Sequence, residues 1–274
     1  MAAVSRPAAS PPNVAGTRQA FEISWTARIG WIVLVAYVAY AASILDFSPA
    51  RFVDGLGNLS RLIGKLFPPL FSNADLRLLM LQGLLESLQI AILASAIGIL
   101  ISLPIGVLAA RNLMPSAVSW AARSLVMVCR AFHPIIVAIL FVKAVGFGAL
   151  AGILALVVAS IGFIAKLFSE AIEEISLKQV EAIRATGAGF MGTLIMAVLP
   201  QVNARFVGFA TYQLDSNLRN STMVGIVGGG GIGGTLQSAF GRFDYDYVAA
   251  ILLTIIVMIM IGEVLSTRLR RLFQ

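Results

Sequence analysis

Charged side chains are scarce in this sequence. Asp, Glu, Lys and Arg make up 12% of the 274 residues, whereas 59% are hydrophobic. Soluble domains carry about 25% charged residues, so this chain lacks the polar surface that a soluble enzyme of its length needs. We therefore expect an all-α protein that crosses a membrane several times.

Residues suited to nucleophilic or metal chemistry are also few. The chain has one cysteine, Cys129, and one histidine, His133. A single cysteine cannot form an intrachain disulfide, and no Cys/His cluster indicates a metal. Because no Ser/His/Asp set or catalytic carboxylate pair is found, a membrane-embedded enzyme is the weakest hypothesis. Next to Pro134, His133 is expected to bond locally rather than to act as a proton switch.

Nucleotide-binding loops are not indicated. GxxxxGK[ST] is absent, and the GxGxxG match at Gly228, Gly230 and Gly233 follows a hydrophobic run rather than a strand. Glycines allow backbones to approach closely. We expect a tight external re-entrant turn that packs at a dimer axis or forms part of an outer gate. Its candidate residues are Gly228, Gly230, Gly231 and Gly233.

Hydrophobic runs predict about six transmembrane helices. Residues 1–28, rich in Ala, Pro and Ser, predict a disordered tail. Residues 29–80 predict a first span followed by an external amphipathic loop. The expected spans are 29–45, 83–110, 118–145 with an interruption at His133-Pro134, 151–169, 202–227 and 247–265.

The net charge of +7 is explained by the excess of Lys and Arg on the cytoplasmic side of membrane proteins rather than by nucleic-acid binding. With six spans, the basic segments near both ends and around 166–205 fall on one side. This bias places both termini, and the stretch 181–200, in the cytoplasm.

Glu181–Pro200, EAIRATGAGFMGTLIMAVLP, is a polar island between two hydrophobic spans. A charged helix, a glycine break and an apolar entry are typical of a docking element on one membrane face. The alternative is an ordinary amphipathic loop helix. The pattern Glu-Ala, Gly187 and Leu199-Pro200 resembles the ATPase-docking loop of ABC importer permeases. Ile183 and Ala197 depart from it, but both changes stay small or apolar.

From about Leu81 to the end, the chain resembles type I ABC importer permeases, and most closely the permease of phosphonate importers. RATGA at 184–188, VLPQV at 198–202 and the block 216–236 carry the likeness. It implies that 81–274 is the permease core and that Lys178–Gly189 forms a coupling helix. Pro200 would start the next span, and glycines at 187 and 189 would permit a sharp turn. The residues assigned to coupling are Lys178, Glu181, Ala182, Arg184, Gly187 and Gly189.

The resemblance also implies a place in the inner membrane of a bacterial cell. It implies partners as well: a second copy of the chain, a cytoplasmic ATPase dimer, an extracytoplasmic binding protein and membrane lipid. The chain itself would need no cofactor, since ATP and Mg would be bound by the ATPase. The expected mechanism is alternating access driven by ATP.

Charges inside predicted spans are the candidates for a translocation path. A charge at the bilayer centre costs a few kcal/mol, so each should face a partner or water. Asp215 and Arg219 could pair at i,i+4, and Arg130 and Arg219 could attract an anion. The alternative is a purely structural clamp, with Arg130 bonded to a helix-end carbonyl. The path candidates are Arg130, His133, Asp215, Asn217 and Arg219.

Three functions remain open on these grounds. The first is an importer permease for phosphonate or a related phosphorus oxyanion. The second is a permease of the same class for an amino acid or another oxyanion. The third is an ATP-independent carrier, which is disfavoured because no internal repeat is found.

Overall fold

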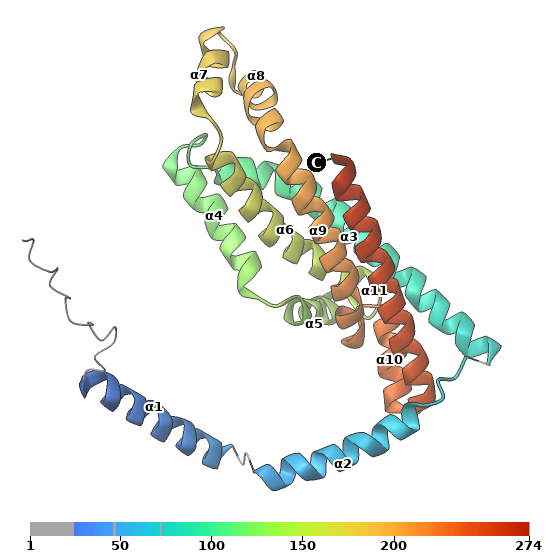
Figure 1. Ribbon diagram of the computed structural model, residues 1–274. Helices are drawn as coiled ribbons and strands as arrows, with labels where there is room; N and C mark the ends of the chain where they lie inside the picture. Colours follow the sequence, from blue (N-terminus) through green and yellow to red (C-terminus); the bar gives the residue numbers. More distant parts are fainter. Residues whose placement is uncertain (1–24, 46–47, 72, 274) are drawn as a thin grey trace, which may run out of the picture. The chain divides into compact units, whose positions relative to one another are not determined.

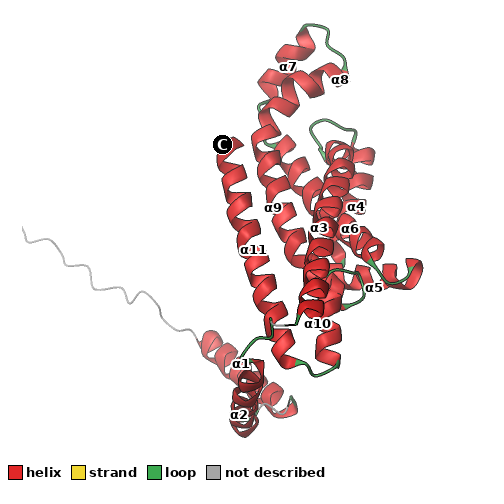
Figure 2. Cartoon of the chain, turned by 90° about the vertical axis from the view of Figure 1, so that its right-hand side faces the viewer, coloured by secondary structure: helices red, strands yellow, loops and turns green. Residues whose placement is uncertain are grey.

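The computed structural model describes residues 25–45, 48–71 and 73–273, and within these ranges it contains helices and loops but no strand (Figures 1 and 2). The chain separates into two compact units, Met1–Ser60 and Arg61–Gln274, which we describe separately. The predicted all-α architecture is confirmed for the described residues.

The first unit contains helix α1, Trp25–Ile44, and most of α2, Pro49–Leu66. The α1 helix is long and apolar enough to cross a membrane and buries no residue within the unit. Residues 1–24 of the predicted tail lie outside the described residues. The last four residues of the predicted tail, 25–28, belong to α1, and the Arg28 guanidinium lies over the Trp25 ring. The predicted end of the tail at residue 28 is therefore wrong. Helix α2 is amphipathic, and the external position of this stretch remains a prediction.

The second unit begins with the end of α2, from Arg61 to Leu66, and continues with the long helix α3, Ala74–Ala109. The α3 helix starts nine residues before the predicted Gly83 because Asn73 caps it. Its side-chain oxygen accepts hydrogen bonds from the backbone N–H groups of Asp75 at 3.0 Å and Leu76 at 3.4 Å. Such a cap satisfies donors that a helix start otherwise leaves unpaired.

The predicted interruption of the third span is confirmed. Helix α4, Ser116–Ala131, and helix α5, Pro134–Val145, meet at a 90° bend at His133-Pro134. Proline disfavours helical backbone in the residue before it, and His133 is extended. The His133 ring nitrogen Nδ1 accepts a hydrogen bond from the Ile135 N–H at 3.3 Å, so the expected local bond is present.

Helix α6, Ala149–Glu173, is the centre of the bundle. It packs most extensively on α3, and also contacts α4, α5 and α9. From Ala151 to Glu173 no residue is exposed. Figure 1 shows α6 flanked by α4 on one side and by α9, Leu199–Ile226, on the other. Side chains on α4 and on α9 are therefore separated by α6 within one copy.

After α6 come α7, Leu177–Ala185, and α8, Phe190–Thr193, which leads through a π-helical turn, Leu194–Val198, into α9. Pro200 lies in the first turn of α9, as predicted, but the helical run that could span a membrane already begins at Phe190 and continues to Ile226. Proline lacks an N–H and clashes with the carbonyl four residues earlier in a regular helix. The wider turn accommodates it, and the Leu199 N–H bonds to the Leu194 carbonyl.

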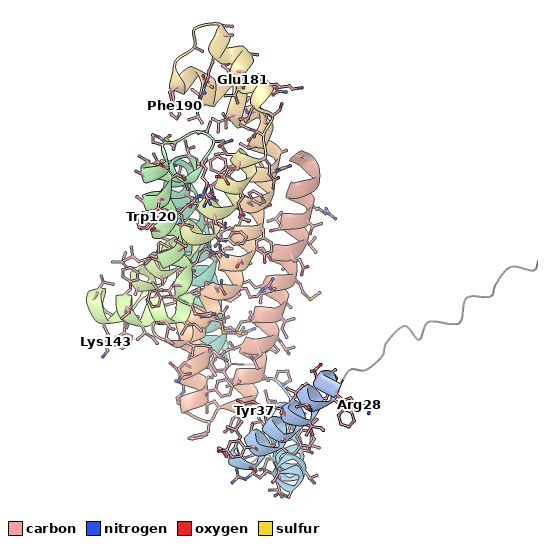
Figure 3. All side chains as sticks on the ribbon, turned by 90° about the vertical axis from the view of Figure 1, so that its left-hand side faces the viewer. Arg28, Tyr37, Trp120, Lys143, Glu181 and Phe190 are labelled. Carbon is pink, nitrogen blue, oxygen red and sulfur yellow. The ribbon has the colours of Figure 1, made fainter. Side chains whose placement is uncertain are left out.

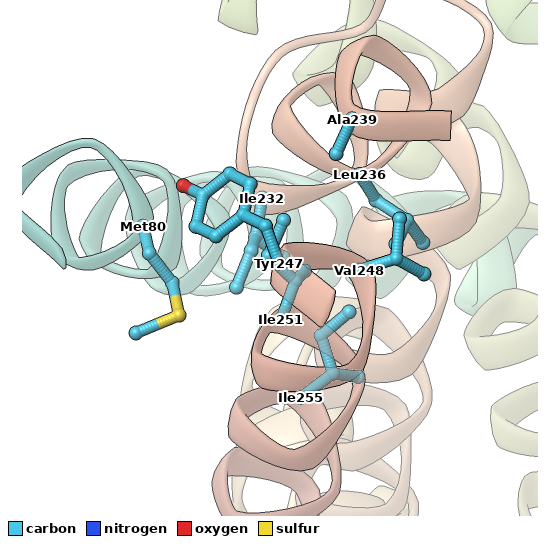
Figure 4. Close-up of a cluster of buried hydrophobic side chains, with 8 residues drawn as sticks. All are labelled: Met80, Ile232, Leu236, Ala239, Tyr247, Val248, Ile251 and Ile255. Atoms are coloured by element: carbon cyan, nitrogen blue, oxygen red, sulfur yellow. The ribbon is translucent and has the colours of Figure 1, made fainter. Parts of the chain in front are cut away.

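The chain closes with α10, Ile232–Gly241, and α11, Tyr245–Phe273. One cluster of buried side chains joins α10 and α11 to Met80 of α3 (Figure 4). Tyr247 is buried in this cluster, and its hydroxyl donates to the Leu76 carbonyl at 2.9 Å. Five described helices are long and apolar enough to span a membrane, or six if α4 and α5 form one span. The chain is thus a multi-pass membrane protein.

Candidate functional site

The segment α7–α8 projects from one end of the bundle, where Glu181 and Phe190 lie far from Lys143 (Figure 3). All six residues predicted for coupling are exposed: Lys178, Glu181, Ala182, Arg184, Gly187 and Gly189. Within the described part of the chain, Glu181 and Arg184 form no ion pair. The segment therefore presents one acidic and one basic side chain to whatever lies beyond this end.

The underside of α7 is apolar and fixed to the bundle. Val180 is buried against a cluster that includes Phe168, Ile172 and Val198. The side-chain carbonyl of Gln201 accepts a hydrogen bond from the Ser176 N–H at 3.0 Å. This packing and this hydrogen bond hold α7 against the bundle, so its polar face points outward.

The two glycines of this segment differ. Gly187 has φ +82°, a backbone conformation that glycine adopts without strain, and its N–H caps the Arg184 carbonyl at 3.0 Å. Gly189 has extended backbone, and nothing lies within 4 Å of a Cβ placed there. The prediction that the turn requires glycine holds at 187 and is wrong at 189.

Glu173, at the end of α6, joins three elements just before α7. One carboxylate oxygen accepts from the Arg111 backbone N–H at 2.7 Å and from the Arg123 guanidinium of α4 at 2.5 Å. The Nε–H of Arg123 donates to the Ala109 carbonyl at 2.9 Å. This arrangement fixes the end of α3, the start of α4 and the end of α6 relative to one another.

We predict that Glu173→Gln weakens this junction, because an amide carries no charge and cannot match the carboxylate as an acceptor from both groups. Thermal unfolding in detergent should show a loss of about 1.5–3 kcal/mol, the range for hydrogen bonds to charged groups. The neighbouring Glu174→Gln is the control. Glu174 pairs with Arg205, but both side chains are more than half exposed, so the loss should stay below about 1 kcal/mol. Equal losses would contradict the role given to Glu173.

Asp215 and Arg219 form the predicted i,i+4 pair on α9, with the Arg219 nitrogen 3.1 Å from a carboxylate oxygen. The Arg219 side chain is 57% exposed and that of Asp215 is 12% exposed. The second Asp215 oxygen is buried and has no partner among the described residues. Arg130 is exposed on α4, across α6 from this pair. The structure therefore does not bring Arg130 and Arg219 together within one copy.

Asn217 is not part of a surface. It is fully buried, and its amide N–H₂ donates at 2.9 Å to the hydroxyls of Ser95 on α3 and Ser160 on α6. Gln213, one turn earlier, donates to Asn217 and to Ser160. Asn217 therefore adds no exposed polar surface to α9, and its place on a translocation path remains a prediction. It points the other way from the Asp215–Arg219 pair and joins α9 to α3 and α6.

The glycine cluster packs tightly against other parts of the chain. Gly228, Gly230 and Gly231 have positive φ. A Cβ on Gly231 would lie 2.3 Å from the Ser87 hydroxyl, which accepts from the Ile232 N–H, and one on Gly233 would lie 2.0 Å from the Thr222 carbonyl oxygen. A place at a dimer axis or an outer gate remains a prediction.

No role was predicted for Arg123, Glu173 or Gln213. Gln213 stands four residues before Asn217, a spacing that places two amides on one helix face. Small polar residues such as Ser160 in an apolar span are a second signal of a helix contact. The Arg123–Glu173 contact joins residues far apart in the sequence, and no local pattern indicates it. In the described residues no group of His, Cys, Asp and Glu could hold a metal.

Comparison with known proteins agrees with this arrangement. The chain is 38% identical to the phosphite transport system permease protein PtxC of Stutzerimonas stutzeri, over 93% of this chain and 92% of that protein. It is also 38% identical to the phosphate-import permease protein PhnE of Mycolicibacterium smegmatis, over 85% of this chain, but it spans only 43% of that relative's length.

The chain is also similar to a solved structure of the MetNI methionine ABC transporter in an inward-facing conformation. The match covers 74% of this chain and 99% of the chain in that structure, with 26% identity and a TM-score of 0.65. Residues 102–274 match the model of one protein family. That range includes α4 to α11 and thus the projecting α7–α8 segment, the Glu173 junction and the glycine cluster. The chain belongs to the family of binding-protein-dependent transport system inner membrane components.

Proposed function

We propose that this chain is the permease subunit of an ATP-driven importer that translocates phosphonate or a related phosphorus oxyanion. The main support for this proposal is the similarity to a phosphite permease protein. The two sequences are 38% identical, and the match extends over nearly the whole of both chains. A multi-pass helical bundle with a projecting, charged helix at one end supports the same function.

The partners in this proposal are a cytoplasmic ATPase dimer, which binds ATP and Mg, an extracytoplasmic binding protein and a second copy of this chain. Both termini and α7 face the cytoplasm of a bacterial cell. A second copy is supported by α9, where Arg219 is exposed on a membrane-spanning helix. Because a charge facing lipid is costly, this face of α9 needs a protein or water neighbour.

Coupling to the ATPase is assigned to α7. Glu181 and Arg184 are exposed without partners in the described chain, while Val180 fixes the helix from below. A partner groove with complementary charges would pair both side chains and move α7 as a rigid piece. Buried against a partner, such charge-assisted bonds are stronger than at a free surface.

Methionine or another amino acid is the second candidate solute. It is favoured by the similarity to the MetNI structure and by 26% identity to the probable D-methionine permease protein MetI of Vibrio cholerae. Both identities are lower than those to the phosphite and phosphate permeases.

The test is purification of the tagged chain from its native membranes in mild detergent, with identification and stoichiometry of the proteins that accompany it. We expect an ATPase at one copy per permease, and its loss from the double variant Glu181→Ala/Arg184→Ala. The reconstituted complex with its binding protein should hydrolyse ATP faster with phosphonate or phosphite than with methionine.

Gln237→Ala/Arg242→Ala is the matched control, since both residues are exposed at the opposite end of the bundle. It should retain the ATPase. A folded chain that recovers no ATPase and still moves solute in liposomes would instead indicate an ATP-independent carrier. Stimulation by methionine alone would select the second candidate.

A further inference from the structure

A cavity of about 490 Å³ lies where the end of α3 meets α4 and α6. Four basic residues line it: Arg111 from the loop after α3, Arg123 and Arg130 from α4, and Lys166 from α6. Much of the remaining wall is apolar, with Trp120, Val126 and Met127 among its residues. So many basic groups around one cavity in a membrane protein require an explanation.

The cavity reaches into the membrane-spanning part of the bundle. The Arg130 side chain crosses α6 at Gly162, near the middle of that helix, where an added Cβ would lie 2.7 Å from the Arg130 Cγ. Arg123 lies two helical turns earlier on the same face of α4, about 10 Å along the axis. Arg111 lies beyond it, beside the Glu173 junction. The basic residues therefore extend from mid-membrane to the end of the bundle that bears α7.

The charges in the cavity do not balance. Lys166 pairs with Glu170 and Arg123 with Glu173, each at 2.5 Å. Among the residues that the structure describes, neither the Arg111 nor the Arg130 guanidinium forms an ion pair, although the Arg111 backbone N–H bonds to Glu173. Two guanidinium groups are thus in excess over the neighbouring carboxylates. Inside a membrane, an unpaired charge such as that of Arg130 faces the bundle interior or a water-filled cavity.

We propose that this cavity binds a small phosphorus oxyanion, such as phosphate or a phosphonate, on its passage between mid-membrane and the α7 end of the bundle. The guanidinium fork matches the oxygens of such an anion, and charge-assisted bonds of this kind are strong. This assignment rests on the proposed function, to which it adds a binding site in the permease itself.

The same chemistry could be offered by the phosphate of an anionic lipid headgroup. Headgroups lie at the membrane surface, outside a hydrocarbon core about 30 Å thick. Arg130, beside the middle of α6, lies deeper than a headgroup. The depth of this unpaired guanidinium therefore favours a small anion that can enter the cavity.

The test measures the electrostatic potential in the cavity with a thiol probe. In a Cys129→Ala background, Ala131→Cys introduces a single thiol at a cavity-lining position. The protein is reconstituted in nanodiscs of phosphatidylcholine, and the rates of modification by an anionic and a cationic methanethiosulfonate are compared. Positively charged clefts concentrate anions at least about tenfold, so the ratio of anionic to cationic rates should exceed that of a free thiol by about tenfold.

Millimolar inorganic phosphate or methylphosphonate should slow the anionic reagent, whereas equal ionic strength from chloride should not. Arg130→Gln should lower the rate ratio and abolish the protection, and Arg130→Lys should keep the raised ratio. Lys143→Gln is the matched control, because Lys143 is an exposed cation on α5 outside the cavity. If Arg130→Gln does not fold, Lys166→Gln provides the same comparison.

A rate ratio that neither phosphate nor Arg130→Gln changes would overturn the proposal. So would protection that occurs only in discs with phosphatidylglycerol, because the ligand would then be a lipid headgroup. The assay needs no ATPase and no binding protein. Failure of phosphonate-stimulated ATP hydrolysis would thus count against the proposed function, and an unchanged thiol reactivity against this site.

Discussion

Gly233→Ala is expected to be among the most damaging single-methyl changes in the chain. The added Cβ would lie 2.0 Å from the Thr222 carbonyl oxygen and 2.8 Å from the Ile226 backbone nitrogen. Both atoms belong to the backbone of α9 and cannot move aside as a side chain can, so α10 must separate from α9. Overpacking costs typically 1–3 kcal/mol, and we expect about 3 kcal/mol or more here. The measurement is the unfolding midpoint in a denaturant titration in detergent.

Gly208→Ala is the matched control for this prediction. Gly208 lies in α9, the helix against which Gly233 packs, but nothing lies within 4 Å of a Cβ placed there. Alanine is the better helix former, so this variant should be unchanged or more stable by about 0.5–1 kcal/mol. Similar destabilisation of both variants would mean that the loss at Gly233 does not come from its close contact with the α9 backbone.

Asn217→Leu is expected to separate α9 from α3 and α6. The substitution removes two hydrogen bonds to serine hydroxyls and the acceptor used by Gln213, all in a buried site. Hydrogen bonds between membrane helices contribute about 0.6 kcal/mol each on average and up to about 1.7 kcal/mol. For three such bonds we expect a loss of about 2–4 kcal/mol in the same titration, because the partners stay buried without their amide.

Asn220→Leu changes the same residue type on the same helix. Asn220 is partly buried and makes one long bond, 3.4 Å to the Ser216 hydroxyl. Its replacement should therefore cost less than about 1 kcal/mol. If Asn217→Leu were equally mild while ATP-driven uptake failed, Asn217 would belong to the translocation path rather than to the helix contact.

Features that depend on neighbouring residues could be predicted from the sequence. The break at His133-Pro134 follows from proline chemistry, and the Asp215–Arg219 pair follows from helical spacing. The exposure of Glu181 and Arg184 follows from a charged patch between two apolar spans. In each case the decisive interaction lies within four residues, where the helix geometry is known in advance.

Features that depend on packing could not be predicted in the same way. Asn217 and Arg219 are two residues apart in a polar stretch, and only the neighbouring helices decide that one is buried and the other exposed. The long helix through Pro200 was missed because proline usually marks a helix start, whereas a π-helical turn accommodates it here. The basic cavity was missed because its four cations come from three separate segments.

The unbroken run from Phe190 to Ile226 has a mechanical consequence. Its 37 residues make a rod of about 55 Å, roughly 25 Å longer than the hydrocarbon core of a bilayer. No loop interrupts the helix between Phe190 and the glycine cluster that follows Ile226. A displacement of one end along the helix axis would therefore also displace the other end. The π-helical turn at Leu194–Val198 is an irregular segment of this long helix, so we expect any bending of the helix to occur there.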